Sequence, residues 1–449
     1  MQTYQNEFQR LKSARNFVQS HFPLFGVNKT QEITRLLYEI SKKDGIAPNE
    51  IIPDDIRLAY GEIKKYLLEQ RFPESFCFDQ NIRPYLPKIE LKKEEALRIK
   101  EKKFYPKNIF VEKAVQESVL VKRLRNLFPR ARFTEIEALK SYECAHRGLG
   151  IKDYNRRQET VFVVAETQDF FKRCPCTKSA VGCGYHVFNL GFGCIYECTY
   201  CFLQEYTNAP GIILPANTES FFNKFSSYKR EGMRIGTGEF SDSLALDDVT
   251  GYSLPLIDFF SKHKEVRFEF KTKSNNIANL LKSRHAGNIV VSWSLNPSKI
   301  IKENEFYSAS LDQRLFSAQK CARAGYSLGF HFDPVIYFEG WEKEYKNLIE
   351  KLFSKIKPHD IAWISVGTLR FTPNLKQIIE KRFPSNKILN AEMLLSYDDK
   401  LRYARQVRLK VYDVILKALF KHLPKSKVYL CMEESGIWED LSLKSVELH

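Results

Sequence analysis

Apolar residues recur with helical spacing in the first part of the chain. One set occupies positions i, i+3, i+4 and i+7 and consists of Ile33, Leu36, Leu37 and Ile40. Asn28, followed by Gln31 three residues later, fits the start of this helix. Pro53 opens a second set on one helical face, made of Ile56, Tyr60, Ile63 and Leu67. Both sets predict the core-facing surfaces of a small helical domain, with a DNA-binding helix pair as the alternative.

Short apolar runs alternate with helical segments from about residue 186 onward. We predict strands at residues 233–236, 266–270, 288–293, 327–330, 361–365 and 427–430, and an earlier strand at residues 160–164. Helices are predicted between the later strands, at residues 311–324 and 341–352. This repetition predicts a parallel β/α barrel or a doubly wound sheet, in which the chemistry lies at the carboxyl ends of the strands.

Composition narrows the class of protein. A chain of 449 residues that is 43% hydrophobic and 13% aromatic can fill a sizeable core, which excludes a wholly disordered protein. No run reaches the ~18 apolar residues of a membrane span, and the polar start lacks the apolar segment of a secretory signal. We therefore expect a soluble cytoplasmic protein with no membrane partner. The 70 Lys and Arg exceed the 54 Asp and Glu, and the net charge of +16 is compatible with nucleic acid as a partner.

The cysteines are unevenly distributed. Six of the 10 crowd into one short segment: Cys174, Cys176, Cys183, Cys194, Cys198 and Cys201. In a reducing compartment such a group indicates metal binding or redox chemistry instead of disulfides.

The last three of these cysteines have a distinctive spacing. Cys194, Cys198 and Cys201 spell C-x3-C-x2-C, with Tyr200 before the last cysteine. Three thiolates on one tight loop can ligate three irons of a [4Fe–4S] cube and leave the fourth iron open to a substrate or cofactor. A structural zinc site is the alternative, with Cys183 or His186 nearby as a fourth ligand.

This spacing is the signature of the radical S-adenosylmethionine superfamily, and residues 193–204 resemble the cluster loop of the spore photoproduct lyase family of DNA repair enzymes. Residues 320–330, 339–342 and 370–372 are similar to later blocks of that family, in the same order. The resemblance covers about residues 104–435. It implies a partial β/α barrel with the cluster on the loop after the first strand. It further implies a family-specific α/β segment (104–185) and the barrel with a C-terminal segment (186–449). The N-terminal residues lie outside the resemblance, and their helical patterns predict a helical extension (1–103).

The resemblance also implies a set of S-adenosylmethionine contacts. The second strand is expected to end at Gly236 and Gly238, where glycines allow close backbone approach, and at Glu239, whose carboxylate suits the cofactor ammonium. The remaining positions are Ser241, Lys273, Ser294 and Asn296, of which Lys273 suits the cofactor carboxylate. The alternative for a strand-end Ser or Asn is capping of the following helix.

One position departs from the family pattern. Where spore lyases carry the cysteine that gives a hydrogen atom to the product radical, this chain has Glu239. A carboxyl group is a poor hydrogen-atom donor, so Tyr200 and Cys431 are the candidate replacements. Alternatively, Tyr200 packs on the cluster, Cys431 is a core residue, and the reaction needs no such donor.

A second peculiarity lies just upstream of the cluster loop. Cys174 and Cys176 flank Pro175, and Cys183 follows seven residues after Cys176. An auxiliary metal or redox site is one interpretation, and independent packed thiols are the other.

The resemblance implies an enzyme that cleaves S-adenosylmethionine to a 5′-deoxyadenosyl radical and acts as a carbon–carbon lyase on a DNA lesion such as a thymine dimer. Arg370, at a family strand end, is the expected phosphate or substrate contact. A flavodoxin or ferredoxin is the expected electron donor. The alternatives are a radical enzyme acting on RNA or a small molecule, and a non-catalytic iron–sulfur DNA-binding protein.

Overall fold

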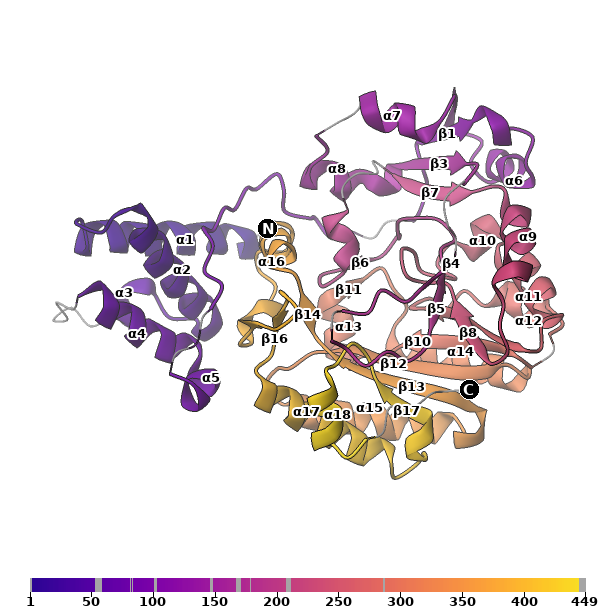
Figure 1. Cartoon of the computed structure of the whole chain (residues 1–449). Helices are drawn as coiled ribbons and strands as arrows, with labels where there is room; N and C mark the ends of the chain where they lie inside the picture. The colour runs from indigo at the N-terminus through magenta and orange to yellow at the C-terminus, as the bar shows by residue number, and fades with distance from the viewer. Residues whose placement is uncertain are drawn as a thin grey trace. The chain divides into compact units, whose positions relative to one another are not determined.

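The computed structural model describes residues 2–52, 59–80, 82, 84–100, 103–145, 148–166, 171–177, 179–206, 211–285 and 287–443. It divides into two compact units (Figure 1). The first joins Met1–Arg98 to Arg370–Arg408, and the second joins Ile99–Leu369 to Leu409–His449. This division follows compactness instead of sequence order, and the domain boundaries at residues 103 and 185 stay a prediction.

The first unit is mainly helical. Its helices are α1 (Gln2–His21), α2 (Val27–Asp44), α3 (Pro48–Ile51), α4 (Tyr60–Arg71), α5 (Pro73–Phe78) and α16 (Pro373–Arg382). A small antiparallel sheet has the order β14 (Arg370–Phe371), β16 (Leu401–Arg402) and β15 (Leu394–Leu395). Helix α17 (Arg405–Leu419) begins in this unit and ends in the second.

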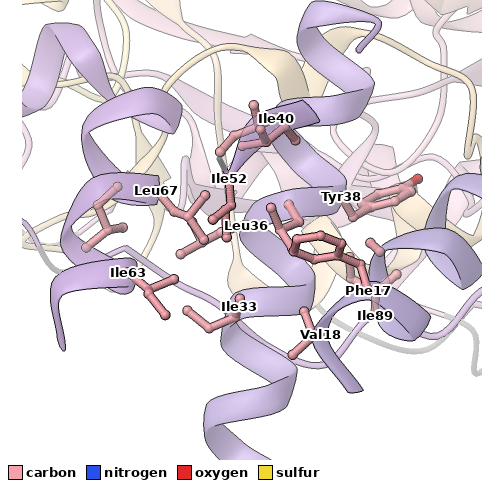
Figure 2. Packing of buried hydrophobic residues seen from close by; sticks show 14 of the residues in the cluster. Phe17, Val18, Ile33, Leu36, Tyr38, Ile40, Ile52, Ile63, Leu67 and Ile89 are labelled. Carbon is pink, nitrogen blue, oxygen red and sulfur yellow. The ribbon is translucent and has the colours of Figure 1, made fainter. Parts of the chain in front are cut away.

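The predicted apolar set of the first helix is confirmed. Ile33, Leu36, Leu37 and Ile40 are all buried on α2. Figure 2 shows this face of α2 packed against residues of the other helices. The predicted helix start was wrong, because α2 begins at Val27 after Gly26, an extended residue that makes no side-chain cap. Asn28 and Gln31 therefore lie within the helix, where an exposed first turn leaves its N–H groups to water.

The second predicted helix is confirmed from Tyr60 onward. Helix α4 buries Ile63 and Leu67, and the Glu62 carboxylate accepts a 2.9 Å hydrogen bond from the backbone N–H of Ala59. Pro53 and Ile56 lie outside the described residues.

A buried charge network joins the sequence-distant parts of the first unit. Glu39 accepts from Arg35 at 2.7 Å, from Arg71 at 2.8 Å and from Lys376 at 3.0 Å. Arg35 also donates to both carboxylate oxygens of Glu380, at 2.8 and 3.0 Å. Burial by itself would raise the pKa of Glu39, but Lys376, Arg71 and Arg35 hold it well below its usual range. Glu39 therefore stays charged and links α2, α4 and α16.

The second unit contains a curled, eight-stranded half-barrel sheet, which confirms the predicted fold class (Figure 1). Its strands, in spatial order, are β17 (Val428–Leu430), β13 (Ile361–Thr368), β12 (Ser327–Val335), β10 (Ile289–Ser294), β9 (Val266–Thr272), β8 (Met233–Gly236), β5 (His186–Phe188) and β4 (Phe171–Arg173). Neighbours are parallel except for the antiparallel pair β4–β5. Each of the six strands predicted after residue 186 is present. Because these strands are parallel, their carboxyl ends lie at one edge of the sheet.

A smaller parallel sheet precedes the half-barrel in the chain, in the order β2 (Arg132–Ile136), β1 (Asn108–Glu112), β3 (Thr160–Val164) and β7 (Ile212–Pro215). The predicted strand at residues 160–164 is β3. The helices of this unit are α6 (Val119–Leu127), α7 (Leu139–Ala145), α8 (Ile151–Arg156), α9 (Thr218–Tyr228), α10 (Asp247–Thr250), α11 (Ser253–Ser261), α12 (Ala278–Lys282), α13 (Ser298–Asn304), α14 (Leu311–Arg323), α15 (Trp341–Lys355) and α18 (Ser435–Asp440). Among the described residues, no helix has the length and apolar character needed to cross a membrane.

Candidate functional site

The three closely spaced cysteines lie on the loop that follows β5, the first parallel strand of the half-barrel. Cys198 is buried and ends β6 (Glu197–Cys198), which pairs with β11 (Glu305–Phe306). Cys194 and Cys201 are half-buried on either side. The loop is therefore fixed by a short strand pair inside the unit, at the carboxyl end of a barrel strand.

A buried arginine from outside the motif holds this loop. Arg157 Nη1 donates to the Glu197 carboxylate at 2.6 Å. Its Nη2 donates to the backbone carbonyls of Cys194 at 3.0 Å and Tyr196 at 2.9 Å. Burial by itself would lower the pKa of Arg157, but Glu197 raises it above its usual range. The guanidinium is therefore a permanent charge that ties together the first half of the loop.

The electrostatic surroundings of the thiols combine burial with nearby cations. Burial raises the pKa of Cys194 to about 12, and it raises the pKa values of Cys198 and Cys201 as well. Lys273 acts in the opposite direction on Cys198 and Cys201. Since iron is bound by thiolates, a cluster that binds here must displace the thiol protons. Three sulfurs on one loop beside two fixed cations fit an anionic iron–sulfur cluster.

The second strand end lies close against the third. A Cβ atom on Gly236 would lie 2.1 Å from the Tyr185 hydroxyl and 2.5 Å from the Glu269 carbonyl oxygen, so no larger residue fits. Gly238 has a φ of +104°, in the region that favours glycine. Both glycines are therefore required by the backbone at the end of β8, whatever else they contact.

Asp242 organises the next turn. Its carboxylate accepts from the backbone N–H groups of Leu244 at 3.0 Å and Lys273 at 2.7 Å, and from the Thr272 hydroxyl at 2.6 Å. These bonds tie the turn after β8 to the end of β9. Ser241 and Cys194 line the same small pocket, so the structure brings one expected cofactor contact to the cluster loop.

Tyr200 and Asn296 belong to one buried network. The Tyr200 hydroxyl donates to the carboxylate of Glu305, and Asn296 Nδ2 donates to the same carboxylate at 3.0 Å. Arg314 Nη2 donates to the other oxygen of Glu305 at 2.5 Å. Burial alone would raise the pKa of Glu305, but Arg314 and Lys273 lower it to about 2. Glu305 is thus charged, and the Tyr200 phenol is held with its proton directed at a carboxylate.

The other predicted residues lie around this network or apart from it. The Lys273 ammonium lies 5.8 Å from the centre of the Tyr200 ring. Ser294 is buried, and its carbonyl oxygen accepts from Arg314 at 2.8 Å. Glu239 pairs with Lys172 of β4, with 3.0 Å between Oε2 and Nζ. The structure therefore gives Glu239 a cationic partner from the chain itself.

Cys431 and Arg370 lie on elements other than the cluster loop. Cys431 follows β17, and its backbone N–H donates to the Val366 carbonyl at 2.8 Å. Arg370 lies in β14 of the first unit. Their predicted roles stay predictions.

Sequence reasoning missed the residues that position the loop. Arg157, Glu305 and Arg314 lie far from the cysteine motif in the sequence, and no local pattern singles them out. Glu197 lies inside the motif. A charged residue between two cysteines was the one feature of the sequence that could have indicated a buried partner such as Arg157. Within the described ranges, no three His, Cys, Asp or Glu side chains are already gathered around a point for a single metal ion.

Comparison with known proteins bears on most of the second unit and on residues 370–408 of the first. A family model described as spore photoproduct lyase matches residues 104–429. The spore photoproduct lyase of Bacillus subtilis is 28% identical over 297 residues, which cover 64% of this chain and 84% of that protein. The Clostridium acetobutylicum enzyme is 29% identical over 201 residues, or 44% of this chain and 60% of that protein.

Solved structures give the same result. A spore photoproduct lyase mutant with bound AdoMet and dinucleoside spore photoproduct has a TM-score of 0.63 and 25% identity, covering 74% of this chain and all 100% of that chain. A second spore photoproduct lyase mutant gives a TM-score of 0.62 at 25% identity, with the same coverage. The residues that the family model matches, 104–429, contain all three cysteines of the cluster loop.

Proposed function

Because this chain belongs to the spore photoproduct lyase family, we propose that it is a radical S-adenosylmethionine lyase that acts on a DNA lesion, with dimerised thymine as the lesion class. The observation that carries the proposal is the cluster loop: three thiols at the carboxyl end of the first barrel strand, locked by the buried Arg157–Glu197 pair. The relative solved with dinucleoside spore photoproduct supports the choice of a DNA photoproduct as the substrate.

The residues present fit both expected cofactors. When bound, a [4Fe–4S] cluster and S-adenosylmethionine supply an electron and a 5′-deoxyadenosyl radical that removes a hydrogen atom from the substrate. Cys194, Cys198 and Cys201 would hold the cluster. Lys273 would bind the cofactor carboxylate, since Cys198 and Glu305 raise the pKa of its ammonium although burial opposes this. A flavodoxin or ferredoxin would supply the electron.

The remaining cofactor contacts follow from their positions. Ser241 lines the pocket beside Cys194, while Ser294 and Asn296 lie at and just beyond the end of β10. Gly236 and Gly238 are glycines because the chain itself fills the space beside them, so they would contact the cofactor through their backbone atoms alone. Glu239 would receive the cofactor ammonium by exchanging it for the ammonium of Lys172.

Tyr200 is the better supported of the two hydrogen-atom donor candidates. Its hydroxyl donates to the charged carboxylate of Glu305. To act as the donor, it would turn from Glu305 to the product radical, so that its O–H bond breaks, a C–H bond forms on the product, and a phenoxyl radical remains on Tyr200. Glu239, paired with Lys172, has no weak X–H bond to offer. We therefore expect a lesion chemistry that does not depend on a thiol at position 239.

The test is anaerobic incubation of reconstituted enzyme, dithionite and S-adenosylmethionine with ultraviolet-irradiated DNA, followed by mass spectrometry. We expect 5′-deoxyadenosine together with conversion of a thymine photoproduct, and neither product from Cys198→Ala. Intact S-adenosylmethionine with bound DNA would favour a non-catalytic iron–sulfur DNA-binding protein. Cleaved cofactor with unchanged DNA would favour RNA or a small molecule as the substrate.

A further inference from the structure

Four cysteines outside the cluster loop share one place in the second unit. Cys174 and Cys176 follow β4, Cys183 precedes β5, and Cys431 follows β17. Strands β4 and β17 are the two edges of the eight-stranded sheet. The cysteines therefore come from opposite edges of the half-barrel.

Backbone contacts bring these edges together. The N–H of Val181 donates to the carbonyl of Glu433 at 2.9 Å, and Ala180 forms an antiparallel bridge with Glu434. Both contacts join the β4–β5 loop to the segment after β17, on which Cys431 lies. Strands β4 and β17 are not paired with each other in the described sheet. The β4–β5 loop therefore supplies the backbone contacts between these two edges.

The thiols themselves are neighbours. The Cys174 and Cys176 side chains are hydrogen-bonded to each other, and Cys431 and Cys183 both lie within electrostatic range of Cys174. The backbone N–H of Cys176 donates to the Cys174 carbonyl at 2.7 Å, so the two residues form a tight turn. Four thiols from segments far apart in the sequence thus occupy one neighbourhood.

A buried cation beside them provides an independent observation. Arg234 is 2% exposed and lies within electrostatic range of Cys183. Its Nη2 donates to the Tyr429 hydroxyl at 3.3 Å, whereas Nε and Nη1 have no hydrogen-bond partner in the part of the chain that the structure describes. Glu269, the nearby carboxylate, accepts from His331 and Trp363. A buried guanidinium with two unused donors calls for a further anion.

We propose that Cys174, Cys176, Cys183 and Cys431 form a second metal site, a tetrathiolate centre for zinc or iron that fastens the β4–β5 loop to the end of β17. Four sulfur ligands without histidine or carboxylate favour zinc or an iron–sulfur centre. Binding of Zn²⁺ replaces four S–H bonds by four Zn–S bonds and releases four protons. The complex then carries two negative charges, one of which Arg234 balances.

Binding requires a local rearrangement. The four sulfurs are not yet gathered around one point, and the Cys174 and Cys176 thiols must turn from each other toward the ion. A thiolate bound to metal has no S–H bond to donate, so this assignment removes Cys431 as a hydrogen-atom donor and leaves Tyr200.

The experiment uses the full chain with the three cluster-loop cysteines replaced by alanine, so that no cluster contributes metal. The reduced protein is loaded with Zn²⁺ or Co²⁺ in the presence of a phosphine reductant, and bound metal is counted by mass spectrometry. We expect one equivalent of Zn²⁺ and the strong visible bands of tetrahedral thiolate-bound Co²⁺. Cys183→Ser and Cys431→Ser should each lose this site, while Cys77→Ser, which changes an exposed cysteine, should keep it.

Several outcomes separate this proposal from its rivals and from the proposed function. Iron–sulfur absorption that depends on the same four cysteines would support the site with iron as its metal. No bound metal, or loss of two thiols to a Cys174–Cys176 disulfide in its place, would overturn it. If a serine variant fails to fold, the Co²⁺ spectrum of the parent chain decides, because fewer than four thiolate ligands would refute the assignment. Since the cluster cysteines are absent, failure here leaves the proposed radical chemistry untouched.

Discussion

The contact with the largest expected effect on the cluster loop is the pair formed by Arg157 and Glu197. Each side chain is only 3% exposed. Replacing Arg157 with leucine leaves a buried carboxylate without its cation, which typically costs about 3–5 kcal/mol. The carbonyls of Cys194 and Tyr196 also lose a donor, at about 1 kcal/mol each. Because these losses share one side chain, they are not additive, and we expect the free energy of opening the loop to fall by about 3–5 kcal/mol in total.

The loss of stability should be confined to the cluster loop. The chain has two compact units, so we would follow the loop by hydrogen exchange of the amides in residues 193–204 instead of by global denaturation. A loss of about 3 kcal/mol corresponds to protection factors lower by about a hundredfold, since each 1.4 kcal/mol is a factor of about ten. Iron incorporation on anaerobic reconstitution should fall in parallel, because the three sulfurs are no longer held together.

Two further variants test the reasoning. Arg156 is the adjacent arginine and is 74% exposed, so Arg156→Leu should leave exchange and iron content unchanged. The double variant Arg157→Leu with Glu197→Leu should recover part of the lost protection, because it removes the unpaired charge together with its partner. Normal protection in Arg157→Leu, or effects of the two single changes that simply add, would refute the role of this pair.

Other predictions concern the ligands, the first unit and the substrate. Alanine at any one of the three cluster-loop cysteines should abolish cofactor cleavage and remove the part of the iron–sulfur absorption at about 400 nm that this loop's cluster supplies, whereas Cys77→Ala should preserve both. Glu39→Gln should destabilise the first unit by about 3 kcal/mol near neutral pH. Because the folded-state pKa of Glu39 is lowered, this difference in thermal stability should be full above about pH 4.3 and shrink as the pH falls toward the lowered value; a difference that is constant in acid would contradict it. Tyr200→Phe should still form 5′-deoxyadenosine but yield trapped or aberrant DNA product, and clean turnover would exclude Tyr200 as the donor. DNA affinity should fall with salt at a log–log slope of about −0.9 per phosphate contact, and Arg370→Ala should impair turnover more than bulk binding.

Local patterns determined much of the fold. The apolar sets on α2 and α4 were predicted because a helix repeats its faces every few residues, and the later barrel strands because short apolar runs between helices have few other solutions. The start of α2 was missed because an exposed helix end is fixed by backbone conformation at Gly26 as much as by side-chain type. The pairing of residues 370–408 with the N-terminal helices depends on contacts such as Arg35 with Glu380, which no local pattern contains.

The sequence by itself determined which ligands this protein presents, and the tertiary structure decided what surrounds them. The spacing of Cys194, Cys198 and Cys201 is a property of one loop, and so it can be recognised in the chain without knowing the fold. The charges that hold that loop, Arg157 and Glu305, reach it only because β6 pairs with β11 and lies against the segment after α8. Cys431 likewise lies near Cys174, Cys176 and Cys183 only because the β4–β5 loop is joined by backbone contacts to the segment after β17. Electrostatic and metal-ligand interactions act over a few ångströms in space, and only folding converts sequence separation into such distances.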